Sequence, residues 1–512
     1  MKADPNSEGR VLLREESQSR SKGVNLQLKL SFATAEKPRP GRGAAGVRKP
    51  GLPGKRTCKV PKAKAKPSMS GSARMEEVAE RLDEAFAKVA ANKGAPGPDR
   101  QTINEVCKCW LKVKVELHNS LLNGTYQPGA IRRKWIPKGS EGKQRGLGIP
   151  NVIDRIVQEA VRQVLEPLYE PTFHRSSHGF RPHRGCQTAI AEAKSYVEEG
   201  YEVVVDLDLE KFFDRVHHQR LMARLAQRVE DKRLLVLIGR MLKVKVVMPD
   251  GVKVATEEGV PQGGPLSPLL SNIVLDEFDH ELSRRGLRFV RYADDVNIYV
   301  GSERAGKRVM ASVERFIERR LRLKVNASKS AVALPETRHF LGYRLHRQSD
   351  GSVEVLLSER SMKRLRNRVL ELTPRTLGWS LKAIITRINE YLRGWLGHFR
   401  VCTQGIKYQV GATDAHIRRR LRAIILKQWK GRRTMARRLI RLGVKSQTAW
   451  RGVYNGHKSI WALSHSPAVD RGLRNAYFAE RGLFSLLGAF EEIWTTVPAP
   501  QQLTLFAVPA RS

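Results

Sequence analysis

The sequence of 512 residues is poor in cysteine, in acidic residues and in long apolar runs. Its five cysteines are odd in number and form no C-x-x-C pair, which argues against a disulfide framework and against a zinc ribbon. No apolar run approaches the ~20 residues that cross a bilayer, and the first residues contain no apolar signal segment. We therefore expect no membrane partner and a cytoplasmic, reducing location.

The scarcity of acidic residues leaves the chain strongly basic. There are 51 Asp and Glu against 93 Lys and Arg, a formal net charge of +42. So large an excess opposes a compact fold unless a polyanion covers it, and nucleic acid is the expected partner. Hydrophobic residues still make up 41% of the chain, and its length predicts two or three domains.

The first part of the chain differs from the rest in composition. Residues 1–72 are rich in Lys, Arg, Pro, Gly and Ser without sustained periodicity, so we predict a disordered basic tail. RNA contact, simple solvation and a wrongly assigned start codon all remain open for it. Beyond it, predicted helices over residues 102–122 and 153–165 flank a predicted β-hairpin with a basic tip between Lys138 and Arg145.

Carboxylates interrupt a predicted strand further along the chain. The run Tyr201–Leu209 is β-branched at its start, and Asp206 and Asp208 within it point to the same face. From Tyr201 to Leu345 the pattern reads strand, helix, hairpin, helix, strand. This order predicts an α+β sheet with helices on one face.

Two adjacent aspartates follow in Tyr292-Ala293-Asp294-Asp295. Apolar, β-favouring residues flank them, so we predict a β-hairpin with both carboxylates at or near its turn. A lone Asp-Asp pair is more often a solvated turn. If this hairpin pairs with the strand that ends at Asp208, however, the carboxylates cluster and a cation has to offset their repulsion. Two Mg²⁺ ions would do so, because Mg²⁺ takes hard oxygen ligands.

After about residue 355 the pattern becomes helical and basic. One apolar stripe runs through Leu381–Phe399 and another through Ile417–Trp429. Six basic residues surround the second stripe: Arg418, Arg419, Arg420, Arg422, Lys427 and Lys430. Such faces are usually only solvated, but on a chain of charge +42 we favour nucleic acid as the partner.

Several motifs occur together in an order that resembles the reverse transcriptases. They are Asp208 to Phe213, Pro261-Gln262-Gly263-Gly264-Pro265-Leu266-Ser267-Pro268 and Tyr292-Ala293-Asp294-Asp295. Others are similar to bacterial group II intron-encoded proteins: Lys93-Gly94-Ala95-Pro96-Gly97, Leu147-Gly148-Ile149-Pro150, Asp154-Arg155, Gly179-Phe180-Arg181-Pro182 and Leu392-Arg393-Gly394-Trp395. The resemblance covers about residues 73–490. It implies an α+β right-hand polymerase, fingers and palm, followed by an α-helical thumb and maturase domain.

This resemblance, together with composition, divides the chain into six parts. They are a disordered basic tail (1–72), fingers (73–200), palm (201–355), thumb and maturase domain X (356–440), a C-terminal basic nucleic-acid-binding region (441–490) and a tail (491–512).

The resemblance also implies roles for single residues. Asp208 and Asp294 would hold two Mg²⁺ ions, and the Leu209 carbonyl and Asp295 would complete the catalytic metal site. Phe213 would lie under the sugar of the incoming dNTP and exclude a 2′-hydroxyl, although core packing alone also explains a phenylalanine there. The other dNTP-binding residues would be Lys138, Arg145, Gln262 and Lys329, the last as a proton donor to pyrophosphate. The primer grip would be Phe340, Leu341, Gly342 and Tyr343, and the RNA-binding residues Arg418, Arg419, Arg422, Lys427 and Lys430.

The implied function is RNA-directed DNA polymerisation from a primer 3′-hydroxyl, joined to maturase activity in splicing and retromobility. The implied partners are group II intron RNA, a DNA target and primer, and dNTPs. A homodimer stays open, and the implied location is the bacterial cytoplasm, in a ribonucleoprotein at the nucleoid. Only Cys402 lies beyond residue 186, so the zinc-binding endonuclease that such proteins often carry is not expected.

Two other functions compete with this one. The first is a pure maturase with a dead polymerase, against which the intact Asp208, Asp294 and Asp295 argue. The second is a domesticated relative that serves phage defence, spacer acquisition or diversification. The intact domain X and the lack of a fused nuclease argue against that reading.

Overall fold

The computed structural model describes residues 73–137, 144–374, 378–455 and 459–496. The predicted tail 1–72, Lys138 at the predicted hairpin tip and residues 497–512 lie outside these ranges. All described residues belong to one compact unit, Cys58–Ser512.

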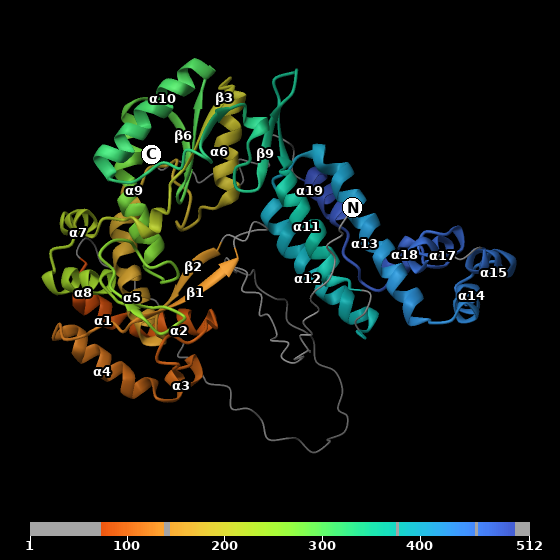
Figure 1. The fold of residues 1–512 in the computed structure, drawn as a ribbon, viewed down its shortest axis with the longest axis horizontal. Helices are drawn as coiled ribbons and strands as arrows, with labels where there is room; N and C mark the ends of the chain where they lie inside the picture. The colour runs from red at the N-terminus through yellow and green to blue at the C-terminus, as the bar shows by residue number, and fades with distance from the viewer. Residues whose placement is uncertain (1–72, 138–143, 375–377, 456–458, 497–512) are drawn as a thin grey trace, which may run out of the picture. The chain divides into compact units, whose positions relative to one another are not determined.

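Among the described residues, six α-helices precede the strand that carries Asp208 (Figure 1). They are α1 (Met75–Glu80), α2 (Leu82–Ala91), α3 (Ile103–Lys108), α4 (Trp110–Leu122), α5 (Val152–Tyr169) and α6 (Cys186–Glu198). The single helix predicted over 102–122 is two helices, because the backbone leaves helical geometry at Cys109 (φ −114°). Thr102 begins the first of them in a capping box with Glu105.

The predicted hairpin before α5 is confirmed. Its strands, β1 (Ile131–Pro137) and β2 (Gln144–Ile149), are antiparallel, with Ile136 opposite Arg145. Two short strands, β4 (Val246–Val247) and β5 (Lys253–Val254), extend the sheet in the order β2-β1-β4-β5.

A second sheet carries the aspartates and has the strand order β6-β7-β3-β8. Its strands are β3 (Val203–Asp208), β6 (Arg288–Tyr292), β7 (Asp295–Val300) and β8 (Ala331–Ala333), and every pairing is antiparallel. The helices between them are α7 (His218–Ala226), α8 (Lys232–Leu242), α9 (Ser267–Arg284) and α10 (Glu303–Phe316), the last extended by a π-turn over Ile317–Leu321.

Helices cover both faces of this sheet, so the prediction of helices on one face is wrong. In Figure 1, α9 and α10 lie on one side of the strands and α6 lies on the other. Along β3, Val203, Val205 and Leu207 enter one hydrophobic core while Val204 enters the second. A strand that is buried on both faces has a nearly continuous apolar sequence. Such a sequence does not show which helices cover each face, so the second layer of helices could not be predicted from it.

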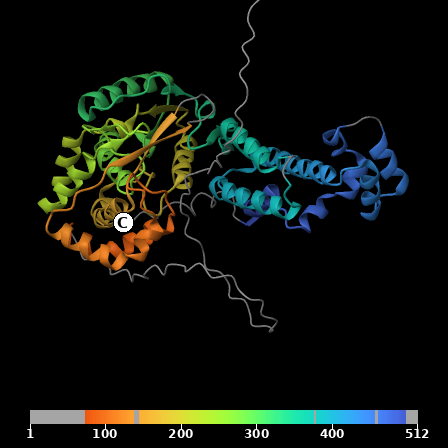
Figure 2. The ribbon, with the colours of Figure 1, turned by 60° about the horizontal axis from the view of Figure 1, so that its bottom comes forward.

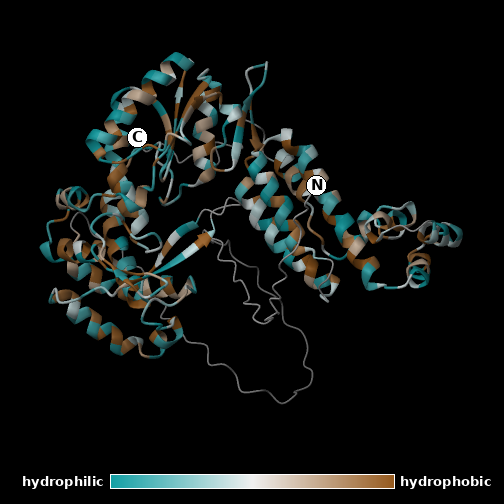
Figure 3. Ribbon diagram, viewed as in Figure 1, coloured by the Kyte–Doolittle hydropathy of each residue, from teal (hydrophilic) through white to brown (hydrophobic). Residues whose placement is uncertain are grey.

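The chain then forms a hairpin and becomes helical. The hairpin strands are β9 (Tyr343–Arg347) and β10 (Val353–Leu357). The longer helices are α11 (Glu359–Leu372), α12 (Leu381–Phe399), α13 (Lys407–Gln428), α14 (Arg432–Arg441), α15 (Ser446–Tyr454) and α19 (Leu486–Thr496). Three short ones, α16 (Ile460–Leu463), α17 (Pro467–Gly472) and α18 (Asn475–Ala479), connect them. Figure 2 gives a second view of these helices, and Figure 3 shows apolar and polar residues alternating around them.

The last helix corrects the predicted tail. Residues 491–496 belong to α19, so the tail does not begin at residue 491. Phe490 is fully buried, and the Trp494 indole N–H donates to the Cys402 carbonyl (2.9 Å). The residues after 490 are therefore part of the folded protein up to Thr496.

Two hydrophobic cores result, and they do not follow the predicted boundaries at 200 and 355. One joins α1–α5 to α7–α10 and the sheet, while the other joins α6 and β9–β10 to the C-terminal helices. No helix in the described part of the chain is long and apolar enough to span a membrane.

Candidate active site

The strand register brings the predicted carboxylates together. Asp208, the last residue of β3, lies opposite Asp295, the first residue of β7, and Asp206 lies opposite Asn297. Residues directly opposite in an antiparallel pair share a face of the sheet. Asp294 occupies the adjoining turn, so all four carboxylates lie at one corner of the sheet.

The turn that carries Asp294 has only two residues, Ala293 and Asp294. Ala293 has a φ of +57°, a left-handed conformation that a residue other than glycine adopts only at a cost. Gly179 lies directly beneath it, because a Cβ on Gly179 would stand 2.4 Å from the Ala293 nitrogen. The segment around Gly179 thus supports the turn by close backbone contact.

A fully buried arginine supports the same turn from inside. The Arg291 guanidinium donates to both oxygens of Asp279 (2.7 and 2.5 Å). It also donates to Asn272 Oδ1 (3.0 Å), to Ser177 Oγ (2.7 Å) and to the Ala293 carbonyl (3.0 Å). All five of its N–H donors are therefore paired. Because one of them binds the turn itself, Arg291 fixes where Asp294 stands.

The clustered carboxylates repel one another. Asp295 stays open to solvent on one side, yet the protein atoms crowded around it remove part of its hydration. That loss, together with the charges of Asp294, Asp208 and Asp206, raises the pKa of Asp295 to about 7. The nearby Lys329 ammonium acts in the opposite direction. The corner therefore favours additional positive charge.

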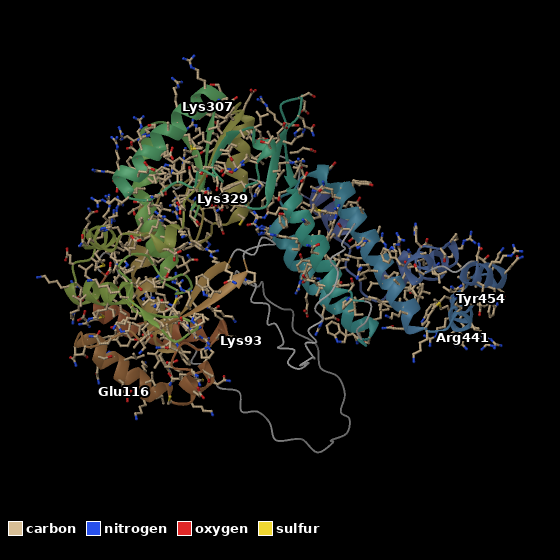
Figure 4. All side chains as sticks on the ribbon, viewed as in Figure 1. Lys93, Glu116, Lys307, Lys329, Arg441 and Tyr454 are labelled. Carbon is tan, nitrogen blue, oxygen red and sulfur yellow. The ribbon has the colours of Figure 1, made fainter. Side chains whose placement is uncertain are left out.

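Lys329 supplies part of that charge in the protein itself. Its ammonium lies 2.6 Å from Asp208 Oδ2, an oxygen that also accepts from the Asn326 amide (3.0 Å). Figure 4 labels Lys329 beside the strands of this sheet, away from Lys307 on α10. The Asn326 bond fixes the orientation of the Asp208 carboxylate.

The residues at this corner fit a divalent cation whose coordination shell is completed by the substrate. Among the residues that the structure describes, no three acidic, histidine or cysteine groups converge into a closed metal site. Mg²⁺ does not need one, since it is usually held by one or two carboxylates together with water and substrate phosphates. The Leu209 carbonyl is also a suitable ligand. The residues on either side of it make backbone bonds to Lys324 and Asn326, which lie on one side of the strand. The Leu209 carbonyl between them therefore points to the other side, on which β7 lies.

The residues expected to bind dNTP converge in part. The Arg145 guanidinium donates to Gln262 Oε1 (2.8 Å), and the Gly148 N–H donates to the Gln262 carbonyl (2.7 Å). These bonds join β2 to the glycine-rich loop before α9. Phe213 is buried, and its carbonyl accepts from the Val260 N–H of the same loop (2.6 Å).

The predicted primer grip is a tight turn. Phe340 and Tyr343 bond each other's backbone (3.0 and 2.9 Å), and Leu341 and Gly342 between them have φ of +54° and +93°. Both rings are buried in the second core, and the Tyr343 hydroxyl donates to the His398 carbonyl. The Gly342 carbonyl accepts from the Ser358 N–H (3.1 Å), so the turn is also bonded to the residue that begins α11.

The predicted RNA-binding residues divide between surface and interior. Lys427 and Lys430 are exposed, and Arg418 is half-buried. Arg419 stacks on Trp461, with its guanidinium 4.2 Å from the ring centre. Arg422, in contrast, is buried, donates to the Leu473 carbonyl (2.9 Å) and pairs with Asp470. The Arg422 charge is thus paired inside the helical domain, and its contact with RNA stays a prediction.

Comparison with known proteins agrees with this geometry. The family described as "Reverse transcriptase (RNA-dependent DNA polymerase)" matches residues 136–345, and "Group II intron, maturase-specific domain" matches residues 362–442. Protein YkfC of Escherichia coli is 34% identical over 343 residues, which cover 59% of this chain and 89% of YkfC. The chain belongs to the group II intron reverse transcriptases and maturases.

Two other relatives of this reverse transcriptase are matched over shorter stretches. Group II intron-encoded protein LtrA of Lactococcus lactis is 36% identical over 208 residues, 40% of this chain and 34% of LtrA. Nuclear intron maturase 4 of Arabidopsis thaliana is 34% identical over 142 residues, 28% of this chain and 18% of that protein. The chain thus spans about a third or less of these two relatives.

The family settles the reaction class and the α+β polymerase fold. This reverse transcriptase is an RNA-directed DNA polymerase, and enzymes of its family use divalent metal ions and nucleic-acid substrates. The sequence did not indicate Arg291 or Asp279 as residues that support the site. Arg291 directly precedes the Tyr-Ala-Asp-Asp motif, and a charged residue inside a buried strand is the one signal that points to it.

Proposed function

We propose that this reverse transcriptase extends a primer 3′-hydroxyl with dNTPs at Asp208 and Asp294, with two Mg²⁺ ions as its cofactor. The observation that carries the proposal is the register that sets Asp208 opposite Asp295, next to the turn that holds Asp294. Two Mg²⁺ ions at these carboxylates would activate the 3′-hydroxyl and stabilise the leaving pyrophosphate.

The protein's own residues would hold and orient the nucleotide. Arg145 and Gln262, already bonded to each other, would receive the triphosphate and base from the β2 side. Phe213 would lie under the sugar and exclude a 2′-hydroxyl while it packs in the core. Lys329 would exchange its bond to Asp208 for one to the triphosphate and give a proton to the departing pyrophosphate. Lys138 is proposed to join them, from outside the described residues.

The helical domain would bind the intron RNA and assist splicing. Lys427, Lys430 and Arg418 offer charge at the surface of α13 and just after it, and the Arg419–Trp461 stack offers an aromatic ring beside that charge. The basic helix α14, with Arg441 labelled in Figure 4, continues the charge. On this proposal the protein works in a ribonucleoprotein, with a DNA target, a DNA primer and dNTPs as its other partners.

Primer extension tests the polymerase. The wild type should extend oligo(dT) on poly(rA) with dTTP and Mg²⁺, and Asp294→Ala should not. EDTA should abolish the reaction and added Mg²⁺ should restore it. Absence of extension by the wild type, or extension by Asp294→Ala, would overturn the proposal.

Splicing tests the helical domain separately. The double variant Lys427→Ala/Lys430→Ala should reduce splicing of the flanking intron and keep primer extension. Lys307→Ala, which removes an exposed charge on α10, is the matched control and should change neither. Equal splicing by the double variant and the wild type would exclude these lysines from RNA binding.

A further inference from the structure

Asp206 lies two residues before Asp208 on the same face of β3, but it is engaged differently. Its Oδ2 accepts from Arg338 Nε (2.8 Å) and Nη2 (2.6 Å). Its Oδ1 accepts from the side-chain amide nitrogen of Asn297 (3.1 Å), with the amide turned so that its nitrogen faces Asp206. Both oxygens of Asp206 are therefore bonded, and the guanidinium balances the charge.

Arg338 makes a further bond that leads back to the active site. Its Nη2 donates to the carbonyl of Lys329 (2.6 Å) while it holds Asp206. The Lys329 ammonium in turn reaches Asp208 Oδ2 (2.6 Å). A continuous chain of contacts thus runs from Asp206 through Arg338 and Lys329 to Asp208.

The loop that carries Lys329 is tied to β3 at further points. The Asn326 N–H donates to the Asp208 carbonyl (2.8 Å), and the Asp208 N–H donates to Ser330 Oγ (3.0 Å). The Lys329 side chain itself is 49% exposed, so packing does not hold it. Its direction depends on where the backbone of residue 329 stands, and Arg338 is the side chain that holds that backbone.

We propose that Asp206 and Arg338 are positioning residues that hold the Lys329 ammonium at Asp208, where the phosphates of the incoming nucleotide arrive. Asp206 is then no metal ligand, although it shares a face with Asp208. The inference rests on the proposed function, since it assigns to Lys329 the contact with triphosphate and pyrophosphate. It adds two residues to that site and gives a role to Asp206, the second carboxylate on β3.

A double-mutant cycle in single-turnover dNTP addition tests the coupling. Arg338→Gln should lower the maximal rate of addition on the order of 10- to 100-fold, the cost of a catalytic group displaced by about 1 Å. In a Lys329→Ala background the same change should cost less than about 2-fold, because the group that Arg338 positions is gone. Equal costs in the two backgrounds would overturn the proposal.

Further variants separate positioning from folding. Asp206→Asn keeps the shape of the side chain and should lower the maximal rate of dNTP addition as Arg338→Gln does. If Arg338→Gln fails to fold, this variant tests the proposal in its place. Arg338→Lys should not restore the rate, because one ammonium cannot replace the guanidinium fork that holds both Asp206 and the Lys329 carbonyl. Arg347→Gln breaks the pair between Arg347 on β9 and Glu202, which does not touch Lys329, and it should behave as the wild type.

Metal binding gives a readout that does not depend on turnover. Mn²⁺ binding followed by electron paramagnetic resonance should be unchanged in Asp206→Asn and weakened in Asp208→Asn. Loss of Mn²⁺ binding in Asp206→Asn would make Asp206 a ligand and overturn the inference. Extension by Asp294→Ala would instead defeat the proposed function, whereas wild-type rates in Arg338→Gln beside an inactive Asp294→Ala would defeat this inference alone.

Discussion

At the scale of single residues, the charges next to Asp294 are held by unusually complete bonding. Arg291 and Asp279 are both fully buried, and Arg291 uses every donor it has. An arginine is needed at this position because five directed N–H groups have to meet four different residues. Lysine would keep the charge but could not make these bonds.

We expect Arg291→Lys to destabilise the protein and to abolish primer extension. Lysine keeps a positive charge beside Asp279 but leaves buried acceptors on Asn272, Ser177 and Ala293 without their donors, at about 1–3 kcal/mol for each. Urea unfolding measures the loss. Arg284→Gln, which removes an exposed arginine paired with Glu281, is the control and should unfold with the wild type. A wild-type urea midpoint for Arg291→Lys would contradict the role given to Arg291.

At the scale of elements, the turn that carries Asp294 depends on a segment more than a hundred residues earlier in the chain. The Ser176 carbonyl and the His178 N–H bond the backbone of Arg291 (2.8 Å each), so residues 176–178 run beside β6 like an added strand. Gly179 then passes under Ala293. The β6–β7 hairpin is therefore not self-sufficient.

Gly179→Ala should displace the turn. Its Cβ would meet backbone atoms of Ala293 and Tyr292, which cannot move aside as a flexible side chain would. A shift of about 1 Å in Asp294 should lower the rate of dNTP addition on the order of 100-fold. Gly301→Ala, at the far end of β7 with nothing within 4 Å of the new methyl group, should keep the wild-type rate. Equal rates for the two variants would contradict this account.

The last helix gives a second test at this scale. The Asp414 carboxylate accepts from the Leu486 and Leu487 N–H groups (3.1 and 3.0 Å) and from Ser485 Oγ (2.7 Å), so it caps the start of α19. Asp414→Ala should lower the free energy of unfolding by about 1–3 kcal/mol, since buried N–H groups lose their acceptor. Asp350→Ala, at an exposed turn, should have little effect in the same urea titration. An unchanged midpoint for Asp414→Ala would show that α19 does not depend on this cap.

These residues also explain how far the sequence could lead. Asp208, Asp294 and Asp295 were predicted because each stands in a short pattern that fixes its own strand or turn. Arg338 could not be assigned to Asp206, because 132 residues separate them and nothing local indicates the pairing. The internal partners of Arg422 could not be found for the same reason, since Asp470 and Leu473 are about fifty residues further on. Local patterns predict elements, whereas long-range bonds depend on packing.

At the scale of the whole molecule, the net charge of +42 governs how the protein meets RNA. Each lysine that contacts a phosphate releases a counterion, so affinity falls with salt. Lys427→Ala/Lys430→Ala should reduce the slope of log affinity against log salt by about 2, one for each phosphate that a lysine no longer neutralises. Filter binding of the intron RNA at several salt concentrations measures it. Lys307→Ala should leave the slope unchanged, and an unchanged slope in the double variant would place the RNA elsewhere.

The central strand has one more consequence, for how the protein could be divided. Val203, Val205 and Leu207 of β3 lie in the core of the polymerase part, and Val204 lies in the core shared with the C-terminal helices. Cutting the chain near residue 358 would leave this side of the sheet, with Val204 of β3 and Tyr299 of β7, without its full cover. Neither piece would be a complete folding unit. Loss of the maturase part, through a nonsense mutation or in an evolving descendant, would thus endanger DNA synthesis as well as splicing.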